Sequence, residues 1–244
     1  GYKRVSRGYI VIAQNNDVTD YLEQAYALAL NLKLTQTVVS NLIVCVDTKT
    51  RKLIKAKHKK VFDKIVDIPW QDDAKDAEWK INNKWKYYYM SPYDETVILD
   101  TDMVFPTDVS YWWDIMSQKD VWATTKVRTY RGEIVTSNFY RKYFKANDLP
   151  NVYTAFFYFK KSDLASELFA MIEIIFQHWQ RMYFKYMPEG KPDWLSGDVA
   201  FALAMQILGI EHLCTRENID TVPTFTHMKS MIQNIPHTNI SEQW

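Results

Sequence analysis

Two carboxylates separated by one residue come directly after a short apolar run. Residues 97–99 are apolar, and Asp100-Thr101-Asp102 follows at once. The apolar run predicts a buried strand, so both carboxylates lie where the chain leaves the core. Carboxylate oxygens are hard ligands, and two of them can share a Mg²⁺ or Mn²⁺ that keeps coordination sites free for a diphosphate. The bare pattern is short enough to arise by chance, and its position at a strand end is what favours a metal site on Asp100 and Asp102.

Apolar runs and helical periodicity alternate along the first half of the chain. The expected strands are 9–13, 42–47, 64–68 and the strand before Asp100, with helices at 21–34, 49–62 and 79–90. This order predicts an α/β fold with a mainly parallel, Rossmann-like sheet and helices on both faces. Ligands of such sheets bind at the carboxyl ends of the strands. The polar residues that fall at such ends are Asn16, Asp47, Asp100 and Asp102.

The second half of the chain is less regular. Strands are expected at 121–125, 152–159, 210–214 and 224–227, and helices at 162–186 and 196–208. Ser196 is the expected N-cap of the last helix, because a serine hydroxyl can accept from a free backbone N–H in the first turn. Residues 126–150 are polar and aromatic without a clear period, so we expect a long excursion there.

Composition narrows the class of protein. Apolar residues make up 47% of the 244 residues, which excludes disorder, and a net charge of +1 gives no sign of a polyanion partner. Cys45 and Cys214 lie in apolar contexts and indicate buried free thiols in a reducing compartment. No signal peptide or membrane span is recognised, so a cytoplasmic location is expected. The basic run at 49–60 is spread around a helix and indicates a solvated face rather than a nucleic-acid site.

Five features occur in a characteristic order. They are Asn16-Asp17 after the first strand, Lys84 sixteen residues before Asp100, the Asp100-Thr101-Asp102 motif, Gly197-Asp198 opening a late helix, and His227 at a strand end. Together they resemble the GT-A glycosyltransferases, in particular the glycogenin-like family 8 of retaining enzymes. The resemblance implies a single GT-A domain over 1–244, with a nucleotide-binding half at about 1–125 and an acceptor half at about 126–244. This chain has Tyr153-Thr154-Ala155 where the family usually has Asn-Ser-Gly.

The resemblance also implies a role for each site residue. Asp100, Asp102 and His227 would hold Mn²⁺ or Mg²⁺, and the residues implied in binding the nucleotide-sugar donor are Asn16, Asp17, Lys84, Asp100 and Lys229. Asp198 would point at the sugar or the acceptor hydroxyl, with Asp193 as a second candidate near the same crevice.

Ordinary structural roles compete with several of these assignments. His227 can be a hydrogen-bonded strand-end histidine, and Asn16 with Asp17 can simply cap a loop. Lys84 can belong to an exposed helix face with Lys80 and Lys86.

The implied activity is transfer of a sugar from a nucleotide sugar, with UDP as the expected nucleotide, to an acceptor hydroxyl with retention. The acceptor is open among a glycan, a protein, a lipid-linked sugar and, as the least favoured choice, a nucleic acid. Acceptor contacts are expected from Arg128, Arg131 and Arg141, and a homodimer is compatible with the chain.

Two other functions fit parts of the sequence. Asp100 to Val104 also fits the motif of haloacid-dehalogenase phosphatases, in which Asp100 would be the nucleophile and Asp102 the acid/base. Against this, three expected strands precede the motif, and Ala202 stands where that class has a second acidic residue. A catalytically silent module that binds nucleotide or carbohydrate is the other alternative.

Overall fold

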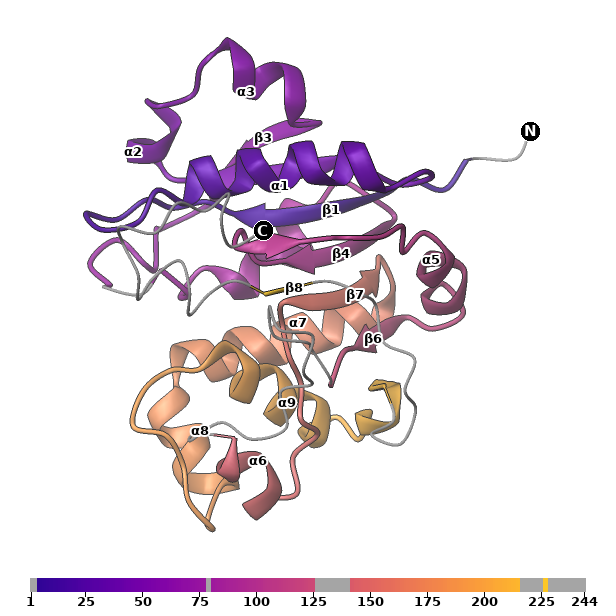
Figure 1. Cartoon of the computed structure of the whole chain (residues 1–244). Helices are drawn as coiled ribbons and strands as arrows, with labels where there is room; N and C mark the ends of the chain where they lie inside the picture. Colours follow the sequence, from indigo (N-terminus) through magenta and orange to yellow (C-terminus); the bar gives the residue numbers. More distant parts are fainter. Residues whose placement is uncertain (1–3, 78–79, 126–140, 216–225, 228–244) are drawn as a thin grey trace.

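Six strands form one sheet in the order β3-β2-β1-β4-β7-β6 (Figure 1). The computed structural model describes residues 4–77, 80–125, 141–215 and 226–227. The strands of this sheet are β1 (Arg7–Ile12), β2 (Leu42–Val46), β3 (Lys64–Asp67), β4 (Glu95–Leu99), β7 (Phe156–Lys160) and β6 (Val121–Ala123). Strands β3, β2, β1 and β4 pair in parallel, and β7 runs antiparallel to both β4 and β6. The predicted α/β fold with a mainly parallel sheet is confirmed.

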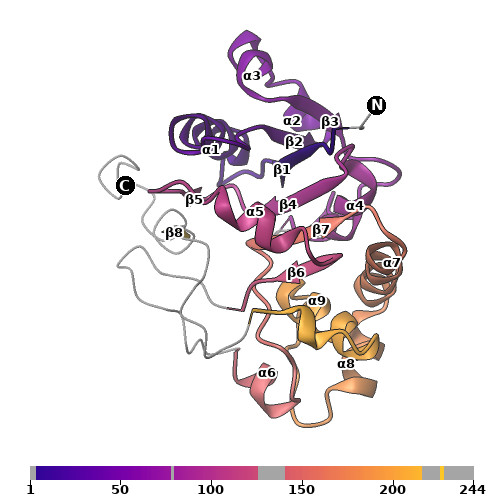
Figure 2. The same ribbon diagram turned by 90° about the vertical axis from the view of Figure 1, so that its right-hand side faces the viewer.

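Helices cover both faces of the sheet because adjacent strand residues point to opposite sides. Tyr9 and Val11 pack in a cluster with α1 (Tyr21–Thr35) and α5 (Tyr111–Met116), whereas Ile10 packs with α7 (Asp163–Gln177) and α9 (Gly197–Ile207). Figure 2 shows α1 and α5 on one side of the strands and α7 on the other. Both layers bury apolar side chains, so the carboxyl edge is left for polar residues.

Three expected helices are interrupted. The 49–62 helix is two pieces, α2 (Thr48–Arg51) and α3 (Ala56–Val61), because Lys55 has an extended backbone. The 79–90 helix is reduced to η1 (Lys84–Lys86) and α4 (Tyr87–Met90) in its described part. The 162–186 helix breaks at His178, whose φ of −131° and ψ of 36° are not helical, into α7 and α8 (Trp179–Tyr186).

Other boundaries in the second half also differ from expectation. The 152–159 strand begins only at Phe156, and the 210–214 strand is the 3₁₀ helix η2 (Glu211–Leu213) with one bridge from Cys214 to Ala123. Ser196 caps α9 as predicted, because its hydroxyl accepts from the N–H of Val199. Two short helices, α5 and α6 (Lys142–Ala146), were not expected. A two-stranded sheet joins β5 (Met103–Val104) to β8 (Thr226–His227).

No helix in the described ranges is long and apolar enough to span a bilayer. Cys45 is a buried free thiol, as expected from the sequence, whereas Cys214 is free but only partly buried.

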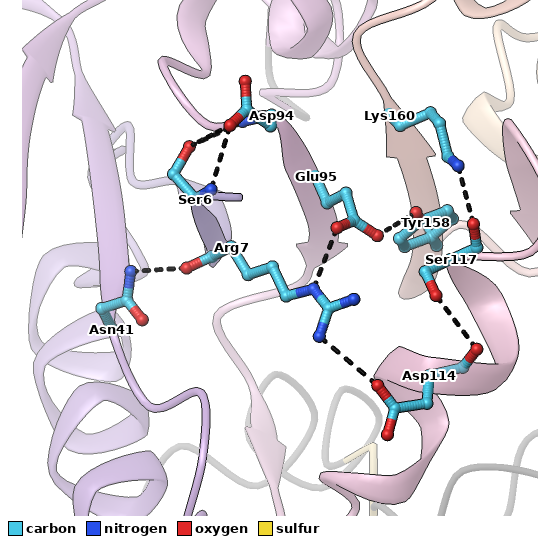
Figure 3. Close-up of polar contacts among 9 residues, drawn as sticks. All are labelled: Ser6, Arg7, Asn41, Asp94, Glu95, Asp114, Ser117, Tyr158 and Lys160. Carbon is cyan, nitrogen blue, oxygen red and sulfur yellow. Dashed lines mark hydrogen bonds and ion pairs between the residues drawn. The ribbon is translucent and has the colours of Figure 1, made fainter. Parts of the chain in front are cut away.

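A partly buried polar network joins the amino ends of β1 and β4 to the antiparallel strand β7 (Figure 3). The Glu95 carboxylate accepts from the Tyr158 hydroxyl and, at 2.9 Å, from Nε of Arg7. Arg7 also lies 3.6 Å from the exposed carboxylate of Asp114. Glu95 thus joins β1, β4 and β7 at the edge of the sheet opposite Asp100.

Replacing Glu95 by alanine should destabilise the fold. Glu95→Ala leaves the buried Tyr158 hydroxyl and the Arg7 guanidinium without their acceptor, which should lower the free energy of unfolding by about 1–3 kcal/mol. Urea unfolding measures the change. The matched control is Asp114→Ala, whose exposed ion pair should contribute only about 0–1 kcal/mol. Equal losses in the two variants would show that the Glu95 network does not stabilise the sheet.

Candidate functional site

The Asp-x-Asp motif forms a fixed turn at the carboxyl end of β4. The Thr101 hydroxyl donates to Oε1 of Gln24 in α1 at 2.8 Å, and the chain then enters β5 at Met103. Asp102 is buried at 7% exposure, while the side chain of Asp100 retains 20%. The motif therefore lies at the predicted strand end, with Asp100 open to the surface.

Lys84 is directed at this motif. Its Nζ lies 3.4 Å from Oδ1 of Asp100. Burial by itself lowers the pKa of Lys84, but the carboxylates of Asp100, Asp198 and Asp102 outweigh it and raise the pKa above its ordinary value. Lys84 is thus an ammonium placed among three carboxylates. The alternative of an exposed lysine face does not fit, since Lys86 is fully buried and the side chain of Lys84 is only 18% exposed.

The position of Lys84 is fixed by its neighbour Asn83. The Asn83 amide is completely buried and donates to Oε1 of Gln14 at 3.1 Å and to Oδ1 of Asp72 at 2.7 Å. Asn83 Oδ1 accepts in turn from the N–H of Asp73 at 3.1 Å. These bonds tie η1 to the loop after β1 and to the loop after β3. The backbone that carries the Lys84 side chain is therefore held in place.

Asp198 reaches the same place from the start of α9. Its Oδ1 accepts from the N–H of Thr154 at 2.9 Å and from the Thr154 hydroxyl at 2.6 Å, and its Oδ2 pairs with Arg141. Burial alone would raise the pKa of Asp198, but Arg141, Thr154 and Lys84 lower it below its ordinary value. A Cβ on Gly197 would lie 3.7 Å from Cδ of Lys84, which shows how closely α9 approaches η1.

Arg141 is a structural partner of Asp198. Its guanidinium carbon lies 4.5 Å from the centre of the Phe144 ring and 4.6 Å from that of Tyr153, and Nη1 donates to the carbonyl of Val152 at 2.7 Å. Arg141 is only 6% exposed. Nη1 and Nη2 of Arg141 are thus bonded within the protein, and the expectation that this residue contacts an acceptor stays a prediction.

The sequence did not point to two residues of this cluster, Thr154 and Tyr153. Both belong to the segment Tyr153-Thr154-Ala155, where the chain departs from the family pattern. The only available signal was the position of this segment just before the aromatic strand. Arg128 and Arg131 lie outside the described residues, so the expectation for them stays a prediction.

A groove runs along the carboxyl ends of β1, β2 and β3. It has a volume of about 1190 Å³, and its lining includes Asn16, Asp17, Asp47, Lys49 and Trp70. Asn16 Oδ1 accepts from the N–H groups of Val18 and Thr19, which is the loop-capping role. Asp17 is exposed and lies 3.6 Å from Lys49. The groove thus lies at the carboxyl ends of the strands on the β1 side of β4, and its lining does not include Asp100 or Lys84.

The remaining predicted residues are described only in part. The backbone of His227 pairs with that of Met103, the residue that follows Asp102. The side chain of His227 and the whole of Lys229 lie outside the described residues. Asp193 is exposed in the loop before α9, and none of the described contacts joins it to Asp198. No three His, Cys, Asp or Glu side chains of the described ranges gather in a metal-binding group.

Comparisons with known proteins support the fold. No protein-family model matches the sequence, and no curated protein sequence is significantly similar. The structure resembles that of mouse xyloside xylosyltransferase 1 in its apo form, with a TM-score of 0.54 and 13% identity over 84% of this chain and 83% of that one. It also resembles the glycosyltransferase GlyE of Streptococcus pneumoniae TIGR4, with a TM-score of 0.56 and 9% identity. This chain is covered over 97% of its length and spans 57% of GlyE. The chain therefore has a fold that is found in glycosyltransferases.

The lowered pKa of Asp198 predicts a specific acid dependence. A carboxyl group whose pKa is lower in the folded state stabilises the protein above its unfolded pKa of about 3.9, and this stability is lost as pH falls through the folded pKa. Asp198→Asn should therefore lose less stability than the wild type between pH 5 and pH 3. Denaturant unfolding at several pH values measures this. Asp193→Asn, which removes an exposed carboxylate, serves as control, and identical slopes for wild type and Asp198→Asn would contradict the assigned ionic state.

Proposed function

We propose that the protein is a metal-dependent glycosyltransferase that uses a nucleotide sugar, with UDP as the expected nucleotide. The observation that carries the proposal is the convergence of Asp100, Asp102, Lys84 and Asp198 at the carboxyl edge of the sheet, in a fold found in glycosyltransferases. In open α/β sheets this edge is where ligands bind. The resemblance to the glycogenin-like family supports the same assignment residue by residue.

The chemistry of the donor set suits a hard divalent cation. Asp100 and Asp102 offer carboxylate oxygens, and Asp100 is accessible from the surface. Mg²⁺ and Mn²⁺ sites in such enzymes commonly use one or two carboxylates, with water and substrate phosphates completing the shell. His227 is proposed as a further ligand because its backbone lies beside the motif. When bound, the metal would supply Lewis-acid assistance to departure of the nucleoside diphosphate.

Lys84 is proposed to bind the diphosphate of the donor. Its raised pKa keeps it charged over the whole range in which the enzyme would work. A fixed cation beside Asp100 can neutralise charge that develops on the departing phosphate without having to reorganise. Lys229 is proposed for the same task from the C-terminal segment.

Asp198 is proposed to act on the sugar or the acceptor hydroxyl. Since Arg141 and Thr154 keep its pKa low, it is a poor general base near neutral pH. A fixed carboxylate can instead accept a hydrogen bond from a sugar hydroxyl and stabilise positive charge that develops on the ring. This role is compatible with the proposed retention, in which the acceptor approaches from the face that the diphosphate leaves.

The alternative functions receive less support. In the structure β1, β2 and β3 precede β4 in the sequence, whereas the phosphatase motif normally follows the first strand. A silent binding module would have the same fold, so only activity separates it from a transferase. The structure does not distinguish among four classes of acceptor, namely a glycan, a protein, a lipid-linked sugar and a nucleic acid.

The decisive experiment is a screen of nucleotide sugars for Mn²⁺-dependent hydrolysis. We expect one donor, with a UDP sugar as the first choice, to release its nucleoside diphosphate in the presence of Mn²⁺. Asp102→Asn should abolish Mn²⁺-dependent nucleotide binding by removing one hard ligand, and its unfolding curve should show an intact fold. Unchanged metal-dependent affinity in Asp102→Asn would exclude the proposed metal site. Binding without any hydrolysis would favour the silent module.

Asp198→Asn should separate binding from turnover. The variant keeps Asp100, Asp102 and Lys84, so nucleotide affinity should stay within about twofold of the wild type while kcat falls by about 10²-fold or more. Calorimetry and steady-state kinetics measure the two quantities. Asp193→Asn tests the second candidate in the same assay. Normal turnover in Asp198→Asn would remove its proposed role.

A further inference from the structure

Trp70 combines exposure with a rare backbone conformation. Its side chain is 67% exposed, and its φ of 60° lies in the left-handed region that bulky residues seldom adopt. The residue follows Pro69 directly after β3 and lines the groove at the carboxyl ends of the strands. A large apolar side chain in a conformation that costs free energy calls for a compensating interaction or a function.

The loop around Trp70 is held by hydrogen bonds from a buried lysine side chain. Nζ of Lys86 donates to the carbonyl of Pro69 at 3.0 Å and to the carbonyl of Gln71 at 2.5 Å, on either side of Trp70. Lys86 itself is completely buried. Both flanking carbonyls are thus turned inward, which leaves the Trp70 side chain directed outward.

The indole of Trp70 is also oriented by aromatic contacts. It stacks on Trp85 with the ring centres 5.7 Å apart and the planes within 3° of each other. Tyr89 meets the Trp70 ring edge-on at 5.5 Å. Trp85 is anchored in turn, because its Nε1 donates to Asp73 at 2.9 Å. One face of the Trp70 indole is therefore covered by Trp85. The exposed area of the side chain belongs to the parts of the indole that Trp85 and Tyr89 do not cover.

We propose that Trp70 is the stacking surface for the planar base of the donor nucleotide, with Lys86 as the residue that positions it. The inference rests on the proposed function, since it assigns the base end of the same ligand. The groove that Trp70 lines also contains Asn16, Asp17 and Asp47, which offer hydrogen-bonding groups for the edge of a base or a ribose. Aromatic side chains stack on the π-face of any base. Trp70 would therefore contribute affinity for the nucleotide, and the polar residues at the strand ends would select among bases.

The test compares ligands with and without a base. The dissociation constants of UDP, GDP, ADP and inorganic pyrophosphate are measured by calorimetry with Mn²⁺ for the wild type and for Trp70→Ala. Loss of one base–aromatic stack should weaken the best-bound nucleoside diphosphate about tenfold to a hundredfold and leave pyrophosphate unchanged. Trp70→Phe should recover most of the affinity.

Two further variants separate stacking from loop structure. Trp70→Gly removes the ring and also suits a positive φ, so its weaker base binding cannot be ascribed to backbone strain. Lys86→Met removes both donors to the loop and should lower the ratio of nucleotide to pyrophosphate affinity. Phe184→Ala, which removes an aromatic ring that is 77% exposed on α8, is the matched control and should bind as the wild type does.

Each outcome has a distinct meaning. Equal nucleotide affinity in wild type and Trp70→Ala overturns the stacking role and leaves the proposed function in place. An equal loss for nucleotide and pyrophosphate also overturns it, because the loop would then act only as structure. A wild type that binds none of the four ligands with Mn²⁺ contradicts the proposed function itself.

Discussion

The candidate site depends on one partly buried ammonium, that of Lys84. Lys84 lies 3.4 Å from Asp100 and also interacts electrostatically with Asp102 and Asp198. Carboxylates that approach each other in a partly buried place repel, and this repulsion would oppose the docking of α9 against the end of β4. A cation shared among them converts that cost into an attraction. Lys84 is therefore a constraint on the fold as well as a candidate ligand of the diphosphate.

Arg141 provides the second cation, and it comes from a part of the chain without regular periodicity. Its guanidinium carbon lies over the rings of Phe144 and Tyr153, while Nη2 pairs with Asp198 and Nη1 donates to the carbonyl of Val152. Such an arrangement suits arginine, whose planar group stacks and hydrogen-bonds at the same time. The result is that Asp198 stays ionised and cannot rotate freely. An ion with a fixed orientation is what charge stabilisation requires.

Apolar runs and helical periods in the sequence predict most of the fold. The site was harder to predict, because it depends on ion pairs between residues that are far apart in the sequence. Three of the four parallel strands, β1, β2 and β4, were predicted because each is an apolar run that the sheet buries on both faces, whereas the edge strand β3 is partly exposed. Helix interruptions such as His178 were missed because apolar periodicity continues across the break. The Asp100–Lys84 pair could be expected from the ordered family features. The Arg141–Asp198 pair joins residues 57 positions apart, and Arg141 comes from a segment with no clear period. Likewise, nothing local distinguishes the buried Lys86 from an exposed lysine.

The two ends of the sheet differ in how far their charges are balanced. At the amino end, Glu95 is matched by Arg7 and the Tyr158 hydroxyl, and the second carboxylate near Arg7, that of Asp114, is exposed to solvent. At the carboxyl end, the described residues place three carboxylates, Asp100, Asp102 and Asp198, against two cations, Lys84 and Arg141. A negative excess attracts a divalent cation, and the metal that we propose would turn the excess positive. A positive excess in turn attracts a diphosphate, so the charge balance favours binding of metal before nucleotide.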